Sequence, residues 1–257
     1  MFNGHTVTVV IPAYNEEGTI SDVVNDFGAS EFTDHVIVVD NNCSDRTAKL
    51  AQAAGASVIE ESVPGYGCAL RAGMRAAETD IIVLTEADGS FKSKDLIKLL
   101  VYLDSAGMVL GTRTTRQLVQ QGANMDFILR WGNVIAAKIL QLLWYIPHEP
   151  RLTDVGCTYR ALWRETYDVL RDGLTDTGPG FSPEMICEAF RHGVRVIEVP
   201  VSYHARVAGE SSHSSGFIRI LQTAGKMFRR IFAKRLQKRP STPEQGPPST
   251  TPAASDD

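Results

Sequence analysis

Short apolar runs alternate with amphipathic stretches along the first 113 residues of the chain. The runs are mostly β-branched and too short for helices, so they predict buried strands at residues 7–11, 36–40, 58–60, 80–86 and 108–113. Stretches with helical character lie between them, at residues 16–27, 45–54, 67–77 and 94–105, and Gly55 follows the second as its C-cap. This alternation predicts an α/β fold with a mostly parallel central sheet flanked by helices.

The chain from Gly216 to Arg239 follows a different pattern. Apolar residues recur at the spacing of one helical face, at Phe217, Ile220, Leu221, Ala224, Met227, Phe228, Ile231 and Phe232. Many of the other positions are basic: Lys226, Arg229, Arg230, Lys234, Arg235, Lys238 and Arg239. We therefore expect one domain over residues 1–213 and a basic amphipathic helical segment over 214–239. Residues 240–257 are rich in Pro, Ser and Thr and have no apolar side chain larger than Ala, so we expect a disordered tail.

The stretch IIVLTEADGS, residues 81–90, places carboxylates at the end of one predicted strand. Side chains two apart on an extended chain point to the same face, so Glu86 and Asp88 converge on one point. Open α/β sheets bind their ligands at the carboxyl ends of strands. Two carboxylates there suit Mg²⁺ or Mn²⁺ carrying a diphosphate. The alternative is a pair of solvated acids that open a turn before Gly89.

Composition narrows the class of protein. Apolar residues make up 43% of the chain and charged residues 22%, which is ordinary for a soluble globular protein. The four cysteines contain no C-x-x-C pair, and we interpret them as reduced thiols in a cytosolic protein: Cys43, Cys68, Cys157 and Cys187. The N-terminus lacks a signal-peptide layout, and the apolar segment 134–147 is interrupted by Lys138 and Gln141, so we expect no transmembrane helix.

The distribution of charge and the absence of two nucleotide-binding motifs narrow the class of protein further. The net charge is −4, yet residues 205–239 contain nine Lys and Arg and a single acid, Glu210. A basic block on an otherwise acidic protein indicates an anion-facing segment. The turn after the first strand reads P-A-Y-N-E where a dinucleotide site would need G-x-G-x-x-G. No G-x-x-x-x-G-K-[ST] occurs either, which excludes a P-loop NTPase.

Three motifs in register carry a resemblance to a known family. VTVVIPAYNEEGTI, then VIVVDNNCSDRTA, then the E-A-D strand end resemble family 2 glycosyltransferases of the GT-A fold. Downstream, DVGCTYRA at 154–161, FSPEM at 181–185 and VIEVPVSYHARVAGES at 196–211 resemble its polyprenyl-phosphate branch, which includes the dolichol-phosphate mannose and glucose synthases. The resemblance implies a GT-A nucleotide-diphospho-sugar transferase domain with a C-terminal amphipathic helix.

The resemblance also implies roles for individual residues. The loop after the first strand would wrap the nucleotide, through Pro12, Ala13, Tyr14, Asn15 and Glu16. Asp40 and Asn42 would contact the base or ribose, with a helix cap at the end of the strand as the alternative for Asp40. Glu86 and Asp88 would hold the metal. Arg113 and Arg130 would grip the acceptor phosphate, although Arg130 is also compatible with an ordinary surface cation. Arg206 would close over the donor diphosphate.

The sequence departs from the family pattern in three places. Glu86 stands where the family usually has Asp, and its side chain is one methylene longer, which affects metal geometry or preference. Ser211, Ser212 and His213 replace a Ser-Lys pair, so one cation is lost. The segment 111–117, GTRTTRQ, is richer in threonine than the expected G-S-R.

The chemistry of the acceptor can be argued from charge alone. A hydroxyl acceptor needs a general base, whereas a phosphate monoester, with a second pKa of about 6, is already mostly dianionic at neutral pH. It needs arginine to hold it against the anionic donor, because guanidinium forks match phosphate. Arg113, Arg130, Arg160 and Arg206 are candidate suppliers. Direct in-line displacement would invert the anomeric centre.

These observations predict an inverting, metal-dependent transferase that moves a hexose from a nucleotide-sugar, of the GDP-mannose or UDP-glucose type, to a polyprenyl phosphate. The alternatives are a family 2 enzyme with a soluble acceptor and a catalytically silent nucleotide-sugar-binding protein. The C-terminal helix either packs on the catalytic domain or lies on anionic lipid. The second option predicts a cytoplasmic protein, peripheral at the inner face of the membrane. No nucleic-acid partner is expected.

Overall fold

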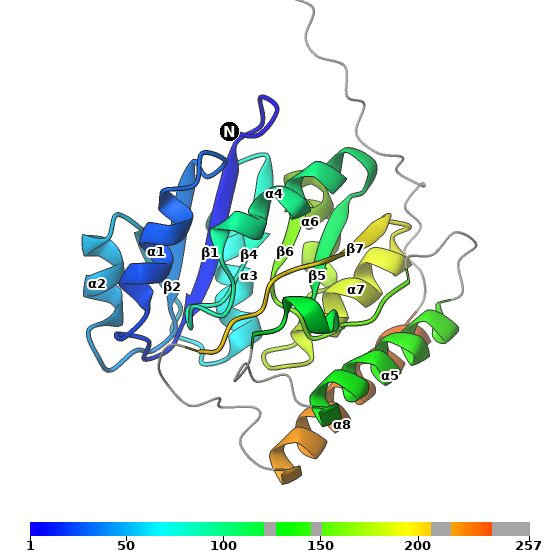
Figure 1. The fold of residues 1–257 in the computed structure, drawn as a ribbon. Coiled ribbons are helices and arrows are strands. Elements are labelled where there is room, and N and C mark those ends of the chain that lie inside the picture. Colours follow the sequence, from blue (N-terminus) through cyan, green and yellow to red (C-terminus); the bar gives the residue numbers. More distant parts are fainter. Residues whose placement is uncertain (121–126, 145–150, 207–216, 238–257) are drawn as a thin grey trace, which may run out of the picture.

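A seven-stranded sheet forms the centre of the computed structural model, which describes residues 1–120, 127–144, 151–206 and 217–237. The spatial order of the strands is β3-β2-β1-β4-β6-β5-β7 (Figure 1). Their bounds are β1 Val7–Ala13, β2 His35–Asp40, β3 Ser57–Glu60, β4 Ile81–Leu84, β5 Met108–Thr112, β6 Arg160–Trp163 and β7 Val196–Pro200. The five strands predicted from apolar runs are confirmed, with ends that differ by at most two residues.

Helices cover both faces of this sheet. They are α1 Ile20–Gly28, α2 Thr47–Ala53, α3 Tyr66–Ala76, α4 Leu96–Val101, α5 Phe127–Leu143, α6 Arg164–Leu170, α7 Phe181–Arg191 and α8 Phe217–Leu236. The single helix predicted over 94–105 is in fact α4 flanked by two 3₁₀ turns. Gly55, with a φ of +98°, adopts the left-handed conformation expected of a residue that ends a helix. The predicted α/β architecture with a mostly parallel sheet is confirmed.

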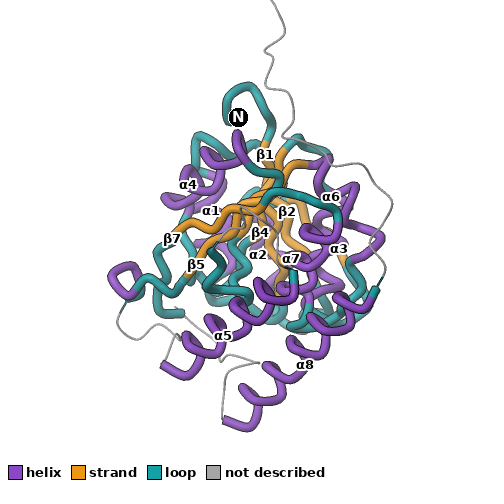
Figure 2. Tube along the Cα trace, turned by 90° about the vertical axis from the view of Figure 1, so that its right-hand side faces the viewer, coloured by secondary structure: helices purple, strands orange, loops and turns teal. Residues whose placement is uncertain are grey.

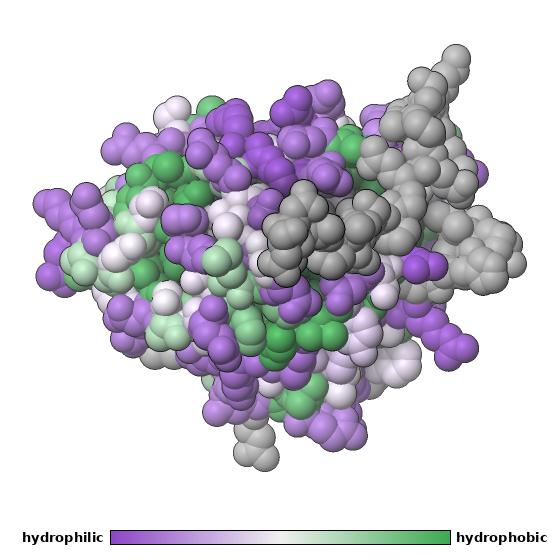
Figure 3. All heavy atoms as spheres, turned by 90° about the horizontal axis from the view of Figure 1, so that it is seen from above, coloured by the Kyte–Doolittle hydropathy of each residue, from purple (hydrophilic) through white to green (hydrophobic). Residues whose placement is uncertain are grey.

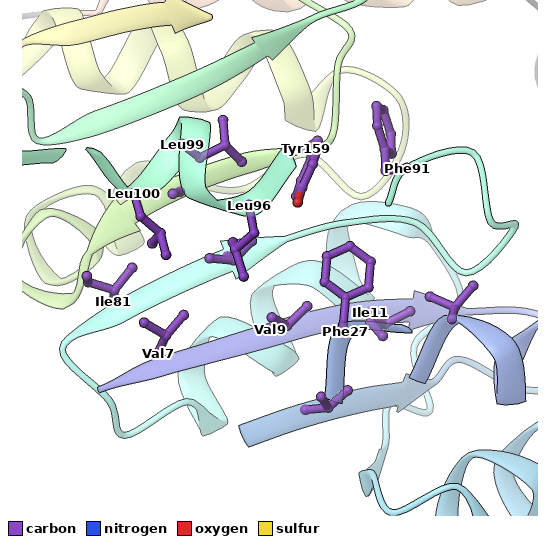
Figure 4. Close-up of a cluster of buried hydrophobic side chains, with 14 of the residues drawn as sticks. Val7, Val9, Ile11, Phe27, Ile81, Phe91, Leu96, Leu99, Leu100 and Tyr159 are labelled. Atoms are coloured by element: carbon purple, nitrogen blue, oxygen red, sulfur yellow. The ribbon is translucent and has the colours of Figure 1, made fainter. Parts of the chain in front are cut away.

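Side chains along each central strand alternate between two hydrophobic cores, as the pleat of a strand requires. Val7, Val9 and Ile11 of β1 face the core beneath α1 and α4, which Figure 4 shows with Phe27 and Leu96 packed over the sheet. Val10, on the opposite face, packs in the core formed with α3 and α7. Burial on both faces explains why these strands are apolar at nearly every position.

Strand β6 runs against its neighbours and was not predicted. It pairs antiparallel with both β4 and β5, and its register places Leu84 opposite Arg160. Because the two strands are antiparallel, the residues that follow Leu84 lie next to the residues that precede Arg160. This reversal brings the segment 154–159 to the edge of the sheet where Glu86 and Asp88 lie.

Helices α5 and α8 lie side by side at one end of the molecule (Figures 1 and 2). Ile231 of α8 is fully buried, and Met227 and Phe228 pack partly buried against the same core. Phe232, assigned to the same stripe from sequence, is instead 48% exposed. The alternative in which this helix packs on the catalytic domain is thus correct for its buried side. The predicted tail, residues 240–257, lies outside the described residues.

The polarity of the described surface and the length of the described helices are relevant to contact with a membrane. Seen from above, it is largely hydrophilic, with hydrophobic side chains in small groups between polar ones (Figure 3). Among the helices that the structure describes, none combines the length and the apolar character needed to cross a membrane. The cysteines of the described residues are free, and three of them are buried: Cys68, Cys157 and Cys187.

Candidate active site

Asp88 lies just beyond β4 and is almost enclosed, with 2% of its surface exposed. Its Oδ1 accepts hydrogen bonds from the backbone N–H and the hydroxyl of Ser90, at 2.9 and 2.6 Å. Its Oδ2 lies 2.9 Å from Nε of Arg206, as an ion pair in which the N–H and the oxygen are not aligned as a hydrogen bond. The alternative of a solvated acid opening a turn is therefore wrong for Asp88.

Glu86 reaches the same edge of the sheet from two residues earlier. Its Oε1 accepts a hydrogen bond from the Thr158 hydroxyl at 2.7 Å. Burial, and then the charge of Asp88, raise the pKa of Glu86 to about 7, although Arg113 and Arg206 act in the opposite direction. The two carboxylates predicted to act together are thus electrostatically coupled, with two guanidinium groups in range.

Arg113 follows β5 and is held by a carboxylate. Its Nε and Nη2 donate to the two oxygens of Asp154 at 2.8 and 2.9 Å, the bidentate geometry typical of strong ion pairs. The Asp154 side chain is fully buried, and its backbone N–H donates to Glu198 at 2.8 Å. The guanidinium also lies over the ring of Tyr203, 5.2 Å from the centroid. Arg113 is therefore rigidly oriented beside Glu86.

The loops after β1 and β2 are tied to each other. The Asn15 side chain accepts a hydrogen bond from the Ser44 backbone at 2.8 Å, and the Glu16 backbone donates to the Thr47 hydroxyl at 2.8 Å. Asn15 and Asn42 have positive φ values of 54° and 66°, a conformation that asparagine tolerates better than most residues. These bonds shape the two predicted nucleotide loops into one structure.

The remaining predicted residues of these loops have different surroundings. Pro12 and Ala13 end β1, and Tyr14 is exposed beside them. Burial, and then the charge of Asp88, raise the pKa of Glu16, so this third carboxylate belongs to the same electrostatic cluster. Oδ1 of Asp40 accepts a hydrogen bond from the Cys43 N–H at 2.8 Å, which closes a turn after β2 and does not cap a helix, since α2 begins at Thr47.

Three functional candidates were missed from sequence. Buried Asn41 donates to the carbonyls of Glu61 and Val63, each at 2.8 Å, and accepts from the Gly65 N–H, so it fixes the turn before α3. Thr158 and Tyr66 form the hydroxyl pair beside Glu86. Asn41 stands next to Asn42, and nothing in the sequence distinguishes the buried amide from the exposed one. Thr158 and Tyr66 are remote in sequence from Glu86, the acid beside which they lie.

Some of the predicted residues are not brought to this cluster. Arg130 lies half-buried on α5, a separate element. Arg160 was wrongly included among the phosphate ligands, because its buried guanidinium donates to the carbonyls of Cys157, Ser182 and Val155 at 2.7, 2.6 and 3.0 Å. Ser211, Ser212 and His213 lie outside the described residues.

The model of one protein family, Glycosyl transferase family 2, matches residues 8–148, which include both predicted nucleotide loops, Glu86 and Asp88. The chain belongs to glycosyl transferase family 2. It is thus a glycosyltransferase, as the three motifs predicted.

Relatives of this family 2 chain are similar over most of its length. An uncharacterized glycosyltransferase of Mycobacterium tuberculosis is 35% identical over 211 residues, covering 82% of this chain and 91% of the relative. A dolichyl-phosphate hexose transferase of Haloferax volcanii is 32% identical over 210 residues, covering 80% of this chain and 85% of the relative. One relative of the chain thus has a name that refers to a polyprenyl phosphate, dolichyl phosphate.

The fold is shared with solved structures. Glucosyl-3-phosphoglycerate synthase from Mycobacterium tuberculosis, in complex with Mn²⁺, uridine diphosphate and phosphoglyceric acid, aligns with a TM-score of 0.70. The alignment covers 93% of this chain and 80% of the synthase, at 20% sequence identity. This likeness confirms the GT-A fold of the family 2 chain.

Proposed function

We propose that this family 2 enzyme moves a hexose, with inversion, from a nucleotide-sugar of the GDP-mannose or UDP-glucose type to a polyprenyl phosphate. The observation that carries the proposal is the charge arrangement at the carboxyl edge of the sheet. There Glu86 and Asp88 lie within electrostatic range of Arg113 and Arg206. Both substrates are anions, so the site needs cations as well as metal ligands. The name of the Haloferax relative supports the lipid acceptor.

Glu86 and Asp88 fit Mg²⁺ or Mn²⁺ as a pair of hard oxygen ligands. Oδ2 of Asp88 is a buried carboxylate oxygen with no aligned hydrogen bond and with a cation, Arg206, beside it. Among the described residues, no three His, Cys, Asp or Glu side chains cluster as a complete ligand set. Phosphate oxygens and water would complete the shell. When bound, the ion would neutralise charge on the leaving diphosphate.

The two joined loops are suited to hold the nucleotide. We assign the backbone turn of Pro12, Ala13, Tyr14, Asn15 and Glu16 to the nucleotide, with Asp40 and Asn42 toward base or ribose. The exposed ring of Tyr14 offers a stacking surface, and Asn42 is fixed by a hydrogen bond to the Glu61 carbonyl at 3.2 Å. Arg206 supplies a guanidinium to the diphosphate.

Arg113 is the first candidate for the acceptor phosphate. Its Nε and Nη2 are engaged by Asp154, which leaves Nη1 to face a ligand. A dianionic phosphate monoester is itself the nucleophile, so the enzyme must orient it and screen its charge without removing a proton. Arg130, which lies on α5 outside this cluster, is the second candidate for the same phosphate.

A soluble acceptor is the second candidate function. It is favoured by the solved structure with phosphoglyceric acid, whose fold this chain shares. Such an acceptor reacts through a hydroxyl and would require a general base near the anomeric carbon. The half-buried acids of the cluster, Glu16 and Glu86, would then be the groups to test for that role.

A lipid acceptor requires contact with a membrane, and α5 and α8 offer the surface for it. Apolar side chains are exposed on both helices: Trp131, Ile135, Leu142, Phe232 and Leu236. Neither helix contains Asp or Glu, and α8 exposes Lys226 and Arg229. An apolar face flanked only by cations suits an anionic membrane surface, with the protein peripheral at its cytoplasmic side.

The deciding experiment supplies the purified chain with radiolabelled GDP-mannose or UDP-glucose, Mn²⁺ and either a polyprenyl phosphate in detergent or 3-phosphoglycerate. We expect organic-extractable product that disappears in EDTA. Asp88→Asn should reduce it by about 100-fold or more, whereas Asp172→Asn, whose side chain is 97% exposed, should not. Water-soluble product alone would favour the second function, and donor binding without transfer to any acceptor would indicate a silent binding protein.

A further inference from the structure

Two hydroxyl groups form a hydrogen-bonded chain that ends at the Glu86 carboxylate. The Thr158 hydroxyl donates to Oε1 of Glu86 at 2.7 Å, and its oxygen lies 2.5 Å from the hydroxyl of Tyr66. Thr158 has a single proton to donate. Since that proton goes to Glu86, the Tyr66 hydroxyl must donate to Thr158. The chain therefore has one direction, from Tyr66 through Thr158 to the carboxylate, and each bond polarises the next.

Both hydroxyls are fixed by the surrounding structure. Thr158 is buried, and the segment before it is pinned by the Arg160 guanidinium through the carbonyls of Val155 and Cys157. Tyr66 begins α3, and its ring packs edge-on against Phe181, with centroids 6.5 Å apart. The turn at Tyr66 is also tight, because a Cβ added at Gly67 would lie 2.1 Å from the Asp176 carbonyl oxygen. The pair is thus a rigid support.

A glutamate at this position needs such a support. Its side chain has one more rotatable bond than aspartate, so its carboxylate samples more orientations unless something holds it. The structure holds Oε1 and leaves Oε2 without a hydrogen bond from any described residue. Metal-ligating carboxylates are commonly oriented by such hydrogen bonds, and their loss typically costs about 10- to 100-fold in metal affinity.

We propose that Thr158 and Tyr66 are positioning residues that fix the rotamer of Glu86 and leave its second oxygen for the divalent cation. The proposal rests on the role given above to Glu86 as a metal ligand. It explains how this chain uses glutamate where its family usually has aspartate: the extra methylene brings the carboxylate within reach of Thr158. The same two residues would then set the metal preference of the site.

The test measures the affinity for Mn²⁺, alone and with UDP or GDP, from the electron paramagnetic resonance signal of the free ion. Thr158→Val keeps the shape and removes the hydroxyl, and it should weaken Mn²⁺ binding by about 10-fold or more. Thr158→Ser restores the donor and should return the affinity to within about 3-fold of the wild type. Tyr66→Phe, which removes only the hydroxyl that orients Thr158, should give a smaller loss in the same direction.

A double-mutant cycle with Glu86→Asp separates positioning from a general structural role. The shorter acid is not expected to reach Thr158, so Thr158→Val should cause little further loss of Mn²⁺ affinity in the Glu86→Asp background. Thermal unfolding without metal checks the fold of each variant. Equal Mn²⁺ affinity in the wild type and Thr158→Val, or an equal loss in both backgrounds, would overturn the inference. Wild-type protein that binds no Mn²⁺ under any of these conditions would instead overturn the proposed function.

Discussion

Arg206 occupies the position beside Asp88 that a divalent cation would also favour. The guanidinium lies 2.9 Å from Oδ2, and the carboxylate is buried, so the charge pair is poorly screened by water. With Asp88 as the proposed metal ligand, a metal ion would compete with Arg206 for the same oxygen until a diphosphate offered Arg206 another anion. One residue is thus expected to oppose metal binding in the free enzyme and to support the reaction once the donor is bound.

This competition predicts effects of opposite sign for one substitution. Arg206→Gln should raise the affinity for Mn²⁺ in the absence of nucleotide by a few-fold, because a positive charge is removed from beside the ligand. The same variant should lower turnover, because the donor diphosphate loses a guanidinium. Calorimetric titration with Mn²⁺ and an assay of sugar transfer measure the two effects. Arg46→Gln, on the exposed surface, is the control, and weaker Mn²⁺ binding by Arg206→Gln would contradict the competition.

The raised pKa of Glu86 predicts a pH dependence of metal binding. Burial and Asp88 raise this pKa to about 7, so at pH 8 the carboxylate is mostly ionised and at pH 6 mostly protonated. Because a metal ligand must be deprotonated, the apparent affinity for Mn²⁺ should fall by roughly 10-fold between pH 8 and pH 6. Glu198, whose pKa burial also raises to about 7, provides a control: Glu198→Gln should keep the dependence. An affinity that is flat over this range would argue against Glu86 as a ligand.

Motifs pointed to the carboxylates of the candidate site but not to the residues that form hydrogen bonds or ion pairs with the site residues. Glu86, Asp88 and Asp40 stand in short local patterns at strand ends, which are readable because a strand end and its loop are contiguous. Thr158 and Asp154 reach the site only because β6 reverses direction between β4 and β5. The motif DVGCTYRA at 154–161 contains both residues, but it does not show which distant residues they meet, so the pairing of Thr158 with Glu86 and of Asp154 with Arg113 was not predictable.

At the scale of elements, α8 is fixed by buried charge as well as by apolar contact. Lys234 is 2% exposed, and its Nζ lies 3.0 Å from Glu184 and 2.7 Å from Glu188, both on α7. Arg230 adds a 2.6 Å contact to Glu184. Two of the cations assigned from sequence to a solvated or lipid-facing side therefore serve the interface with α7. Sequence could not reveal this, because a helical wheel shows which residues share a face but not which acids lie opposite.

Breaking this interface is expected to destabilise the whole domain. Lys234→Met would leave buried carboxylates of α7 without their central cation, and the removal of one partner from a buried ion pair typically costs about 3–5 kcal/mol. Lys226→Met, on the exposed side of the same helix, should change the free energy of unfolding by less than about 0.5 kcal/mol. Urea denaturation monitored by circular dichroism measures both. A loss below about 1 kcal/mol for Lys234→Met would show that α8 is only loosely attached.

The same contacts change how a membrane role should be tested. Truncation after Gly216 would remove Ile231 and Lys234 from the core, so loss of lipid binding by such a protein would be confounded by unfolding. Substitutions on the exposed side of the helices avoid this problem. Strands β1 to β5 and helices α1 to α4 were predictable because apolar periodicity determines them, whereas β6, β7 and the division of α8 into an inward and an outward side required the structure.

At the scale of the whole molecule, the candidate active site and the exposed helices share one end. Figure 1 shows β1 running from the N-terminus toward the end of the molecule at which α5 and α8 lie, and the site is at the carboxyl ends of β1 and β4. An acceptor whose phosphate enters the site and whose chain stays in a bilayer would need this geometry. The side chain of Arg235 on α8 also donates from Nε to the Leu143 carbonyl of α5, at 2.8 Å, which joins the two helices into one surface.

We therefore expect the full chain to co-sediment with vesicles that contain anionic lipid, to bind neutral vesicles much less, and to be released by salt. Leu142→Ser combined with Leu236→Ser removes the two most exposed apolar side chains of this surface, which are 78% and 87% accessible, and should weaken binding by about 10-fold or more. Lys226→Gln with Arg229→Gln should weaken it by up to about 30-fold, since each cation near an anionic surface contributes about 1 kcal/mol. Val101→Ser with Tyr102→Ser, at exposed apolar positions in and next to α4, is the matched control and should bind normally. Absence of binding at low salt, or equal effects of the control pair, would mean that α5 and α8 do not face a membrane, and the lipid acceptor would lose its structural support.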